Sequence, residues 1–325
     1  MERNRDETSN STLYRFARGL DKTVNLTAFV LFVLILLYAG HSLWYNHSLQ
    51  NDSFLSDELA QYRPDGQNPS LADLRKINPD VIAWVTIDDT RIDYPVVQGK
   101  NENEYLNKSV LGEFSLAGSL FLSTDNKRDF SDPYNMVYGH NIEGGAMLAD
   151  VLEFRNASFF KTHTTGILWY PDEGGKARAD RIEIFAALEI DGRDEIVYAN
   201  PRNINTENLS SVAGYVLERA VNKREVTIDE KSRIIALSTC ENAVNFERVL
   251  IFGKLVKMSD GEIKKTLESA GDNDTQSSGG SRPKSLRDLP PWLLPSVGAF
   301  LLILLIYLLW RIHKDRKERR RIRNY

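Results

Sequence analysis

Two long apolar runs lie near the ends of the chain, and each is long enough to cross a membrane. Residues 24–45 carry no charged side chain, and neither do residues 292–310, where tryptophans lie at both edges of the run. About 20 helical residues cross the roughly 30 Å of bilayer hydrocarbon. The pattern therefore predicts two transmembrane helices. A cleaved signal peptide is an alternative for the first run, and the second run would still anchor the product.

Between these runs the hydrophobic pattern is mostly that of β-structure. Short stretches rich in β-branched and aromatic residues recur, bounded by Gly, Pro, Asn and Asp. The expected strands are 81–87, 92–97, 119–122, 136–139, 166–170, 182–190, 233–239 and 249–256. Helical spacing interrupts them at 147–154 and 209–221. Eight strands with peripheral helices predict a mainly β domain, a barrel or a sandwich, over residues 79–258.

The segments that flank this domain differ in character. Residues 46–78 are polar with a helical rhythm, which predicts an extracellular lead-in of two short helices. Residues 259–291 are assigned to a flexible linker, because the composition becomes rich in Gly, Ser, Asp and Asn from about residue 270.

Charge orients the predicted membrane spans. The chain has 41 Lys and Arg against 45 Asp and Glu, but five basic residues lie in tail 1–23 and eight in tail 311–325. Positive residues stay on the cytoplasmic side, so both termini are expected inside and the acidic domain outside. We interpret the arginine-rich tail as a topology signal rather than a lipid- or partner-binding patch. An acidic domain is also a poor nucleic-acid binder.

The chain has one cysteine, Cys240, which excludes a disulfide scaffold and a cysteine-rich zinc module. Cys240 ends one expected strand, and Arg248 opens the next after a polar turn, so a hairpin would bring them together. A buried, inert thiol is the simpler reading of a lone cysteine. A guanidinium beside it, however, can hold a peptide carbonyl or its oxyanion.

A histidine follows another expected strand in the sequence Tyr138-Gly139-His140-Asn141, where Gly139 is expected to let the backbone turn. His140 alone would more often be structural. A free thiol is only a few per cent ionised at neutral pH, however, so a nearby imidazole would activate it as a nucleophile. The combination of Cys240, His140 and Arg248 is therefore more informative than any of the three alone.

These motifs together resemble those of the sortases, the membrane-anchored cysteine transpeptidases of Gram-positive bacteria. The family's strand end Thr-Leu-x-Thr-Cys is matched at residues 236–240, with Ala236 in place of the first threonine, far from the thiol. The histidine motif and the arginine occur in the family's order. The stretches 78–84 and 92–98 and the helix before Cys240 are similar to class B members. A C-terminal span with a basic tail is more typical of the pilin-polymerising class C.

The resemblance implies an eight-stranded sortase-type β-barrel in which His140, Cys240 and Arg248 line one groove. Cys240 would attack the threonine carbonyl of a C-terminal sorting signal, His140 would move the protons, and Arg248 would stabilise the oxyanion. The implied partners are a surface-protein or pilin precursor and an amine acceptor, either a lipid-linked peptidoglycan precursor or a pilin lysine. No metal or cofactor is needed. Ser238, Thr239 and Asn141 are candidates for binding substrate or supporting the site.

Two other functions compete with transpeptidation. A hydrolytic cysteine peptidase of the papain type would have its cysteine before its histidine, which is not the order here. An inert membrane-tethered binding module would keep its phenotype without Cys240. Asp125, Asp129 and Asp132 could bind calcium or orient the imidazole, but a solvated loop is favoured. The remaining histidines are assigned to structure, interface or solvent: His41, His47, His163 and His313.

Overall fold

The computed structural model describes residues 23–43, 57–64, 70–142, 146–171, 177–240 and 247–273. The chain divides into two units, Met1–Ser278 and Gly279–Tyr325, and every described residue belongs to the first. The predicted span 292–310 and the basic tail lie outside the described residues.

One apolar helix near the N-terminus, Thr23–Leu43, is long enough to cross a membrane. Its 21 residues have a mean hydropathy of 2.2. Large apolar side chains are exposed along it, among them Leu34, Ile35 and Leu37. These properties suit a membrane anchor or a signal sequence, and they agree with the predicted span 24–45 over all but its last two residues.

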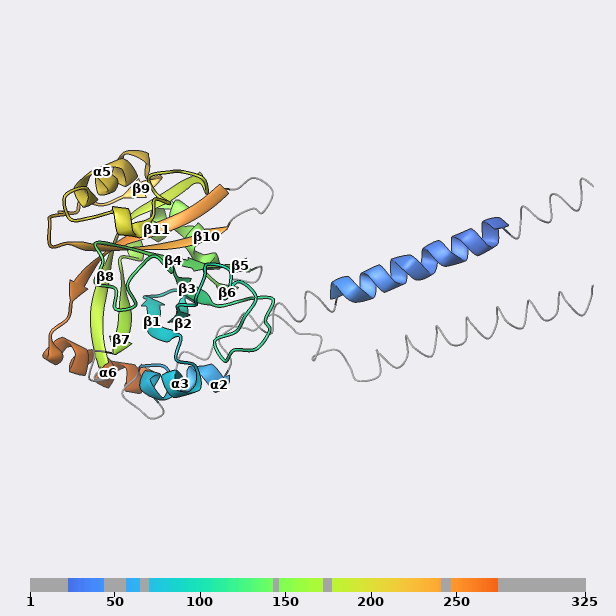
Figure 1. Cartoon of the computed structure of the whole chain (residues 1–325), viewed down its shortest axis with the longest axis horizontal. Helices are drawn as coiled ribbons and strands as arrows, with labels where there is room; N and C mark the ends of the chain where they lie inside the picture. Colours follow the sequence, from blue (N-terminus) through green and yellow to red (C-terminus); the bar gives the residue numbers. More distant parts are fainter. Residues whose placement is uncertain are drawn as a thin grey trace, which may run out of the picture. The chain divides into compact units, whose positions relative to one another are not determined.

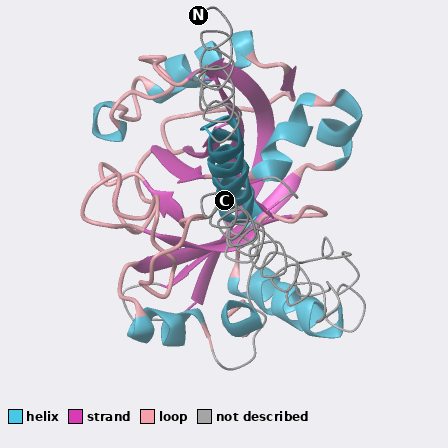
Figure 2. Ribbon diagram, turned by 90° about the vertical axis from the view of Figure 1, so that its right-hand side faces the viewer, coloured by secondary structure: helices cyan, strands magenta, loops and turns pink. Residues whose placement is uncertain are grey.

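Eight strands form a closed barrel (Figures 1 and 2). Around the ring, neighbouring strands follow the order β11-β10-β4-β3-β2-β1-β7-β8, and β8 pairs again with β11 to close it. The strands are β1 (Val81–Ile87), β2 (Asp93–Val97), β3 (Leu120–Leu122), β4 (Tyr134–Gly139), β7 (Thr165–Pro171), β8 (Ala177–Asp191), β10 (Arg233–Cys240) and β11 (Glu247–Lys257). The predicted eight-stranded barrel is confirmed.

Short elements decorate this barrel. A two-residue strand, β9 (Asn222–Lys223), extends the sheet from β8, and β5 (Asn141–Ile142) pairs with β6 (Ala146–Met147). The helices are α2 (Asp57–Ala60), α3 (Leu71–Ile77), η1 (Ala149–Arg155), α4 (Ala157–Thr162), η2 (Pro201–Asn203), α5 (Leu209–Arg219) and α6 (Asp260–Asn273). The two expected lead-in helices correspond to α2 and α3.

Alternation along the strands divides the buried side chains into three clusters. Odd-numbered residues of β10, such as Ile235 and Leu237, belong to the cluster inside the barrel. Even-numbered ones, such as Ile234 and Ala236, pack outward against α5. The third cluster lies under α2, α3 and α6, which gather at the lower end of the barrel in Figure 1. The outward face of β10 therefore belongs to the layer that α5 covers.

Two expectations for local structure need correction. The α-helix expected at 147–154 is the 3-10 helix η1, preceded by the short strand β6. Residues 260–273, assigned above to a flexible linker, form the helix α6. A capping box starts that helix: the Ser259 N–H donates to Glu262 Oε2 at 2.8 Å, and the Glu262 N–H donates to Ser259 Oγ at 3.3 Å. Ile263 is 7% exposed against the barrel.

A buried ion pair joins β8 to β10. Asp180 is fully buried, and its Oδ2 accepts hydrogen bonds from Arg233 Nη2 at 2.6 Å and the Tyr170 hydroxyl at 3.2 Å. Asp180→Ala would leave the largely buried Arg233 cation unpaired, so we expect a loss of about 3–5 kcal/mol in the free energy of unfolding, measured by urea denaturation. Glu268→Ala breaks the exposed pair with Lys264 and should cost no more than about 0.5 kcal/mol. Equal losses would contradict the argument.

Candidate active site

The ends of three adjacent strands bring the predicted catalytic positions together. β4 and β10 run parallel with Gly139 opposite Thr239, so His140 follows at the level of Cys240. β10 and β11 run antiparallel with Cys240 opposite Arg248. Figure 1 shows these strand ends side by side at one edge of the barrel. Positions separated by up to about a hundred residues in the sequence thus meet through backbone register. The side chain of Cys240 lies outside the described part of the structure.

The His140 backbone is fixed by contacts on both sides. Its carbonyl accepts a hydrogen bond from the Leu148 N–H at 3.0 Å. The preceding glycine is needed for close approach rather than for the expected turn, because a Cβ on Gly139 would lie 2.8 Å from the Leu148 side chain. The half-buried His140 ring contacts the Leu106 carbonyl, with 3.0 Å between Nε2 and the oxygen.

Two tyrosines, Tyr138 and Tyr198, lie near enough to Arg248 for its positive charge to act on them. Burial raises the pKa of Tyr198 to about 12 and raises that of Tyr138 further, and the positive charge of Arg248 opposes both shifts. Both hydroxyls are therefore neutral hydrogen-bonding groups at physiological pH. The Tyr198 hydroxyl lies 2.9 Å from Ser238 Oγ. Arg248 itself is half-buried.

No family model matches the chain, but individual relatives do. Sortase B of Listeria monocytogenes is 32% identical over 247 residues, which is 73% of this chain and 97% of the relative. The chain belongs to the sortase family. It is a class B-like member and hence a cysteine transpeptidase.

Solved structures of sortases have the same fold. A class B sortase of Streptococcus pyogenes involved in pilus biogenesis is 36% identical, with a TM-score of 0.50 over 56% of this chain and 96% of that one. Sortase B of Clostridium perfringens is 30% identical, with a TM-score of 0.52 over 57% of this chain and all of that one. The aligned share of this chain corresponds in size to the barrel.

The predicted supporting residues differ in what they contact. Ser238 is buried and meets Tyr198, which links β10 to the segment before η2. Thr239 is also buried, and its Oγ1 has no hydrogen-bond partner within the described residues. Asn141 is half-buried in β5, opposite Met147. Of the three, only Ser238 has a side-chain contact that ties it to the groups around Arg248.

The acidic residues upstream of His140 already have partners. Asp125 accepts a hydrogen bond from Asn200 Nδ2 at 2.8 Å and pairs with Arg202 at 3.3 Å. Asp132 accepts from the Lys127 N–H at 2.6 Å, and Asp129 from the Ser131 N–H at 3.0 Å. Across the described residues, no group of three His, Cys, Asp or Glu side chains is arranged to hold a metal.

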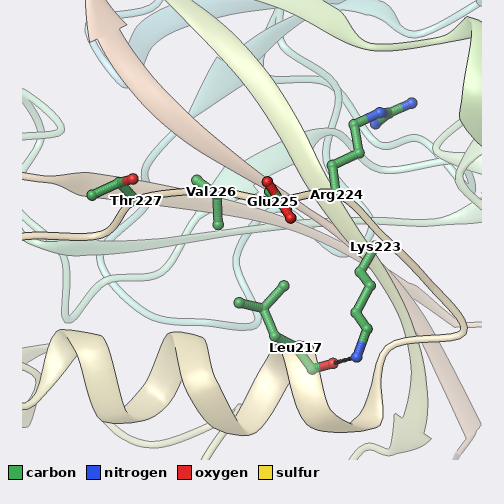
Figure 3. A pocket seen from close by; sticks show the side chains of 6 residues that line it. All are labelled: Leu217, Lys223, Arg224, Glu225, Val226 and Thr227. Carbon is green, nitrogen blue, oxygen red and sulfur yellow. Dashed lines mark hydrogen bonds between the residues drawn. The ribbon is translucent and has the colours of Figure 1, made fainter.

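An open pocket of about 660 Å³ lies away from these residues, between the last turn of α5 and the segment that starts at β9 (Figure 3). Lys223 Nζ donates to the Leu217 carbonyl at 2.9 Å across it. Its other lining residues are Arg224, Glu225, Val226 and Thr227. None of these is a predicted site residue, so the pocket is separate from the strand ends that carry the cysteine, histidine and arginine.

Proposed function

We propose that Cys240, His140 and Arg248 carry out the transpeptidation of this sortase. The observation that carries the proposal is the register that sets Cys240 opposite Arg248 and Thr239 opposite Gly139. It is supported by strand parity, since Cys240 has the parity of Ser238, whose hydroxyl lies 2.9 Å from that of Tyr198, a tyrosine on which the charge of Arg248 acts. Class B membership supplies the reaction type.

The substrate of the proposed reaction is a surface protein with a C-terminal sorting signal. The Cys240 thiolate attacks the scissile carbonyl, the C–N bond breaks, and protonated His140 gives its proton to the leaving amine. A thioester remains on Cys240. An amine of a peptidoglycan precursor then attacks the thioester, His140 removes its proton, and the thiolate leaves. Arg248 holds the oxyanion formed in both steps.

A pilin lysine is a second candidate for the acceptor amine. The relative from S. pyogenes is a class B sortase involved in pilus biogenesis, which favours this alternative. Either acceptor requires the same proton transfers, so the chemistry of the three residues is unchanged. Surface proteins encoded beside this gene, inspected for a sorting signal, an apolar segment and a basic tail, supply the test peptides.

Mass analysis of the products tests the proposed reaction. The full chain in detergent is incubated with a sorting peptide alone, with a glycine peptide, and with a lysine-containing pilin peptide. A peptide–amine conjugate identifies transfer and its preferred acceptor. A free acid alone would indicate a hydrolytic peptidase, and unchanged peptide with every acceptor would favour the inert binding module.

We further propose that the enzyme is a two-pass protein of the cell membrane, with both termini in the cytoplasm and the barrel outside. The apolar helix Thr23–Leu43 and the distribution of basic residues support this. Cys240 is the only cysteine of the chain. A membrane-impermeant maleimide added to intact cells should therefore label this protein, and only at Cys240. Labelling only after lysis would contradict the orientation.

Arg248→Lys should retain a small part of the transfer activity. Lysine keeps the positive charge but loses the planar fork that can hold two acceptor atoms, so we expect kcat to fall about 10²–10³-fold. Arg181→Lys is a matched control, because Arg181 lies at the opposite end of the β8–β11 ribbon, opposite Val256, in exposed ion pairs with Glu183 and Glu262. Unaltered turnover in Arg248→Lys would contradict the assigned role.

A further inference from the structure

The hydrogen bond of the His140 ring assigns its tautomer. Nε2 lies 3.0 Å from the Leu106 carbonyl oxygen. A carbonyl oxygen can only accept, so Nε2 must carry a proton both in the neutral ring and in the imidazolium. In neutral His140 the bare nitrogen is therefore Nδ1. That atom alone can take up a proton while the bond to Leu106 is kept.

The carbonyl that holds the ring belongs to a well-anchored loop. Tyr105 is 1% exposed, and its hydroxyl donates to Asp80 Oδ2 at 2.9 Å and accepts from Asn78 Nδ2 at 3.0 Å. The C-terminal end of the loop is also held at Tyr105, because the Ser119 N–H donates to the Tyr105 carbonyl at 3.0 Å. The Leu106 carbonyl thus follows directly on a fixed residue and is held before substrate arrives.

A glycine leaves the space that this carbonyl occupies. Gly118 is buried with φ +62°, and a Cβ there would lie 2.4 Å from the Leu106 oxygen and 2.6 Å from the Tyr105 oxygen. Atoms cannot approach that closely, so any side chain at this position must displace the peptide that bonds His140. The left-handed backbone and the close approach both select glycine.

We propose that the Leu106 carbonyl is the positioning group of His140, and that Gly118 keeps this carbonyl in place. The carbonyl plays the role of the aspartate carboxylate in a Ser-His-Asp triad, because it fixes the tautomer and the orientation of the histidine ring. The inference rests on the proposed function of His140. Nδ1–H then donates its proton to the leaving amine as the C–N bond breaks, and bare Nδ1 accepts the proton of the attacking amine. The Nε2 proton stays on the ring throughout.

Gly118→Ala tests the positioning role, with Gly112→Ala as its matched control. Gly112 lies in the same loop and also has positive φ, +89°, but it is exposed, and a Cβ there would meet only the end of the Lys108 side chain at 4.0 Å. Both variants place an alanine at a position of positive φ. We expect kcat/KM for transfer to fall about 10- to 100-fold in Gly118→Ala, mostly through kcat, and to change less than about threefold in Gly112→Ala. Equal effects in folded variants would overturn the proposal.

The tautomer itself is measured without a substitution at either glycine. The full chain in detergent micelles is labelled with ¹⁵N-histidine, His140→Gln identifies the ring signals, and the pH is raised until the His140 ring is neutral. We expect Nε2 protonated and Nδ1 bare. A neutral ring protonated at Nδ1, or an even mixture of tautomers, would overturn the inference, and this holds even if Gly118→Ala fails to fold.

The two proposals fail in different ways. If His140→Ala retains full transfer activity, the proposed catalytic role of the histidine is wrong whatever its tautomer. If His140→Ala is inactive but the neutral ring is protonated at Nδ1, the catalytic role stands and only the positioning by Leu106 is wrong.

Discussion

Cys240→Ala is expected to remove peptide transfer entirely. Alanine retains the backbone of β10 and its pairing with β11 but has no nucleophile, and loss of the nucleophile from a cooperating catalytic set lowers kcat about 10⁶-fold. Conjugate formation should therefore fall below detection in the mass assay, with both the glycine and the lysine acceptor.

The covalent intermediate gives this prediction a second readout. Incubation with sorting peptide in the absence of an amine, followed by an acid quench, should add one acyl group to the intact protein. Hydroxylamine should release it as a hydroxamate, as expected for a thioester. Because Cys240 is the only thiol, Cys240→Ala must show no adduct and no labelling by iodoacetamide. An acyl adduct in that variant would place the nucleophile elsewhere.

The strands could be predicted because short stretches rich in β-branched and aromatic residues recur along the chain, bounded by turn residues. Where charged residues enter a strand, the pattern underestimates its length. β8 begins at Ala177 rather than at residue 182, since pairing with both β7 and β11 keeps a charged stretch in the sheet. Arg178, Asp180 and Arg181 in that stretch find ion-pair partners that the local pattern does not reveal.

The start of α6 was missed although the sequence contains its signal. Ser259 and Glu262 have the spacing of a capping box, and Ile263 and Leu267 have helical spacing toward the barrel. The Gly- and Ser-rich composition after residue 270 favours a linker, and this signal extends over more residues than the helical spacing does. A linker assigned from composition alone therefore extends too far toward the domain.

The candidate site divides in the same way. The positions of Cys240 and Arg248 follow from a hairpin, which is a local feature, and His140 follows from a motif at a strand end. The groups around them do not follow from sequence. Leu106 is 34 residues from His140, and Tyr198 is 40 residues from Ser238. Every residue has a backbone carbonyl, so the residue type does not reveal which carbonyl contacts His140. No sequence pattern indicates which of the 13 tyrosines lies near Ser238. Tyr138 alone had a signal, since it precedes the Gly-His pair.

His140→Ala is expected to reduce transfer by about 10²–10⁴-fold, to the limit of the assay, because both the leaving and the attacking amine lose their proton carrier. Added imidazole should restore part of the activity, since alanine leaves room where the ring was. His163→Gln is the control. His163 is also half-buried, and both of its ring nitrogens have polar neighbours: Nδ1 lies 2.8 Å from the Phe159 carbonyl oxygen, and Nε2 lies 3.2 Å from the Asp89 carbonyl oxygen.

The His163→Gln control distinguishes a loss of protein stability from a loss of proton transfer. The His163 ring stacks on Phe159 with centroids 3.6 Å apart, so His163→Gln should lower the melting temperature while leaving kcat within about twofold and unresponsive to imidazole. For His140→Ala we expect the reverse: a melting temperature near that of the parent, and activity that depends on added imidazole. If both variants lost activity in proportion to their loss of stability, His140 would be a structural residue like His163. The thiol would then need another partner for the protons that transpeptidation must move.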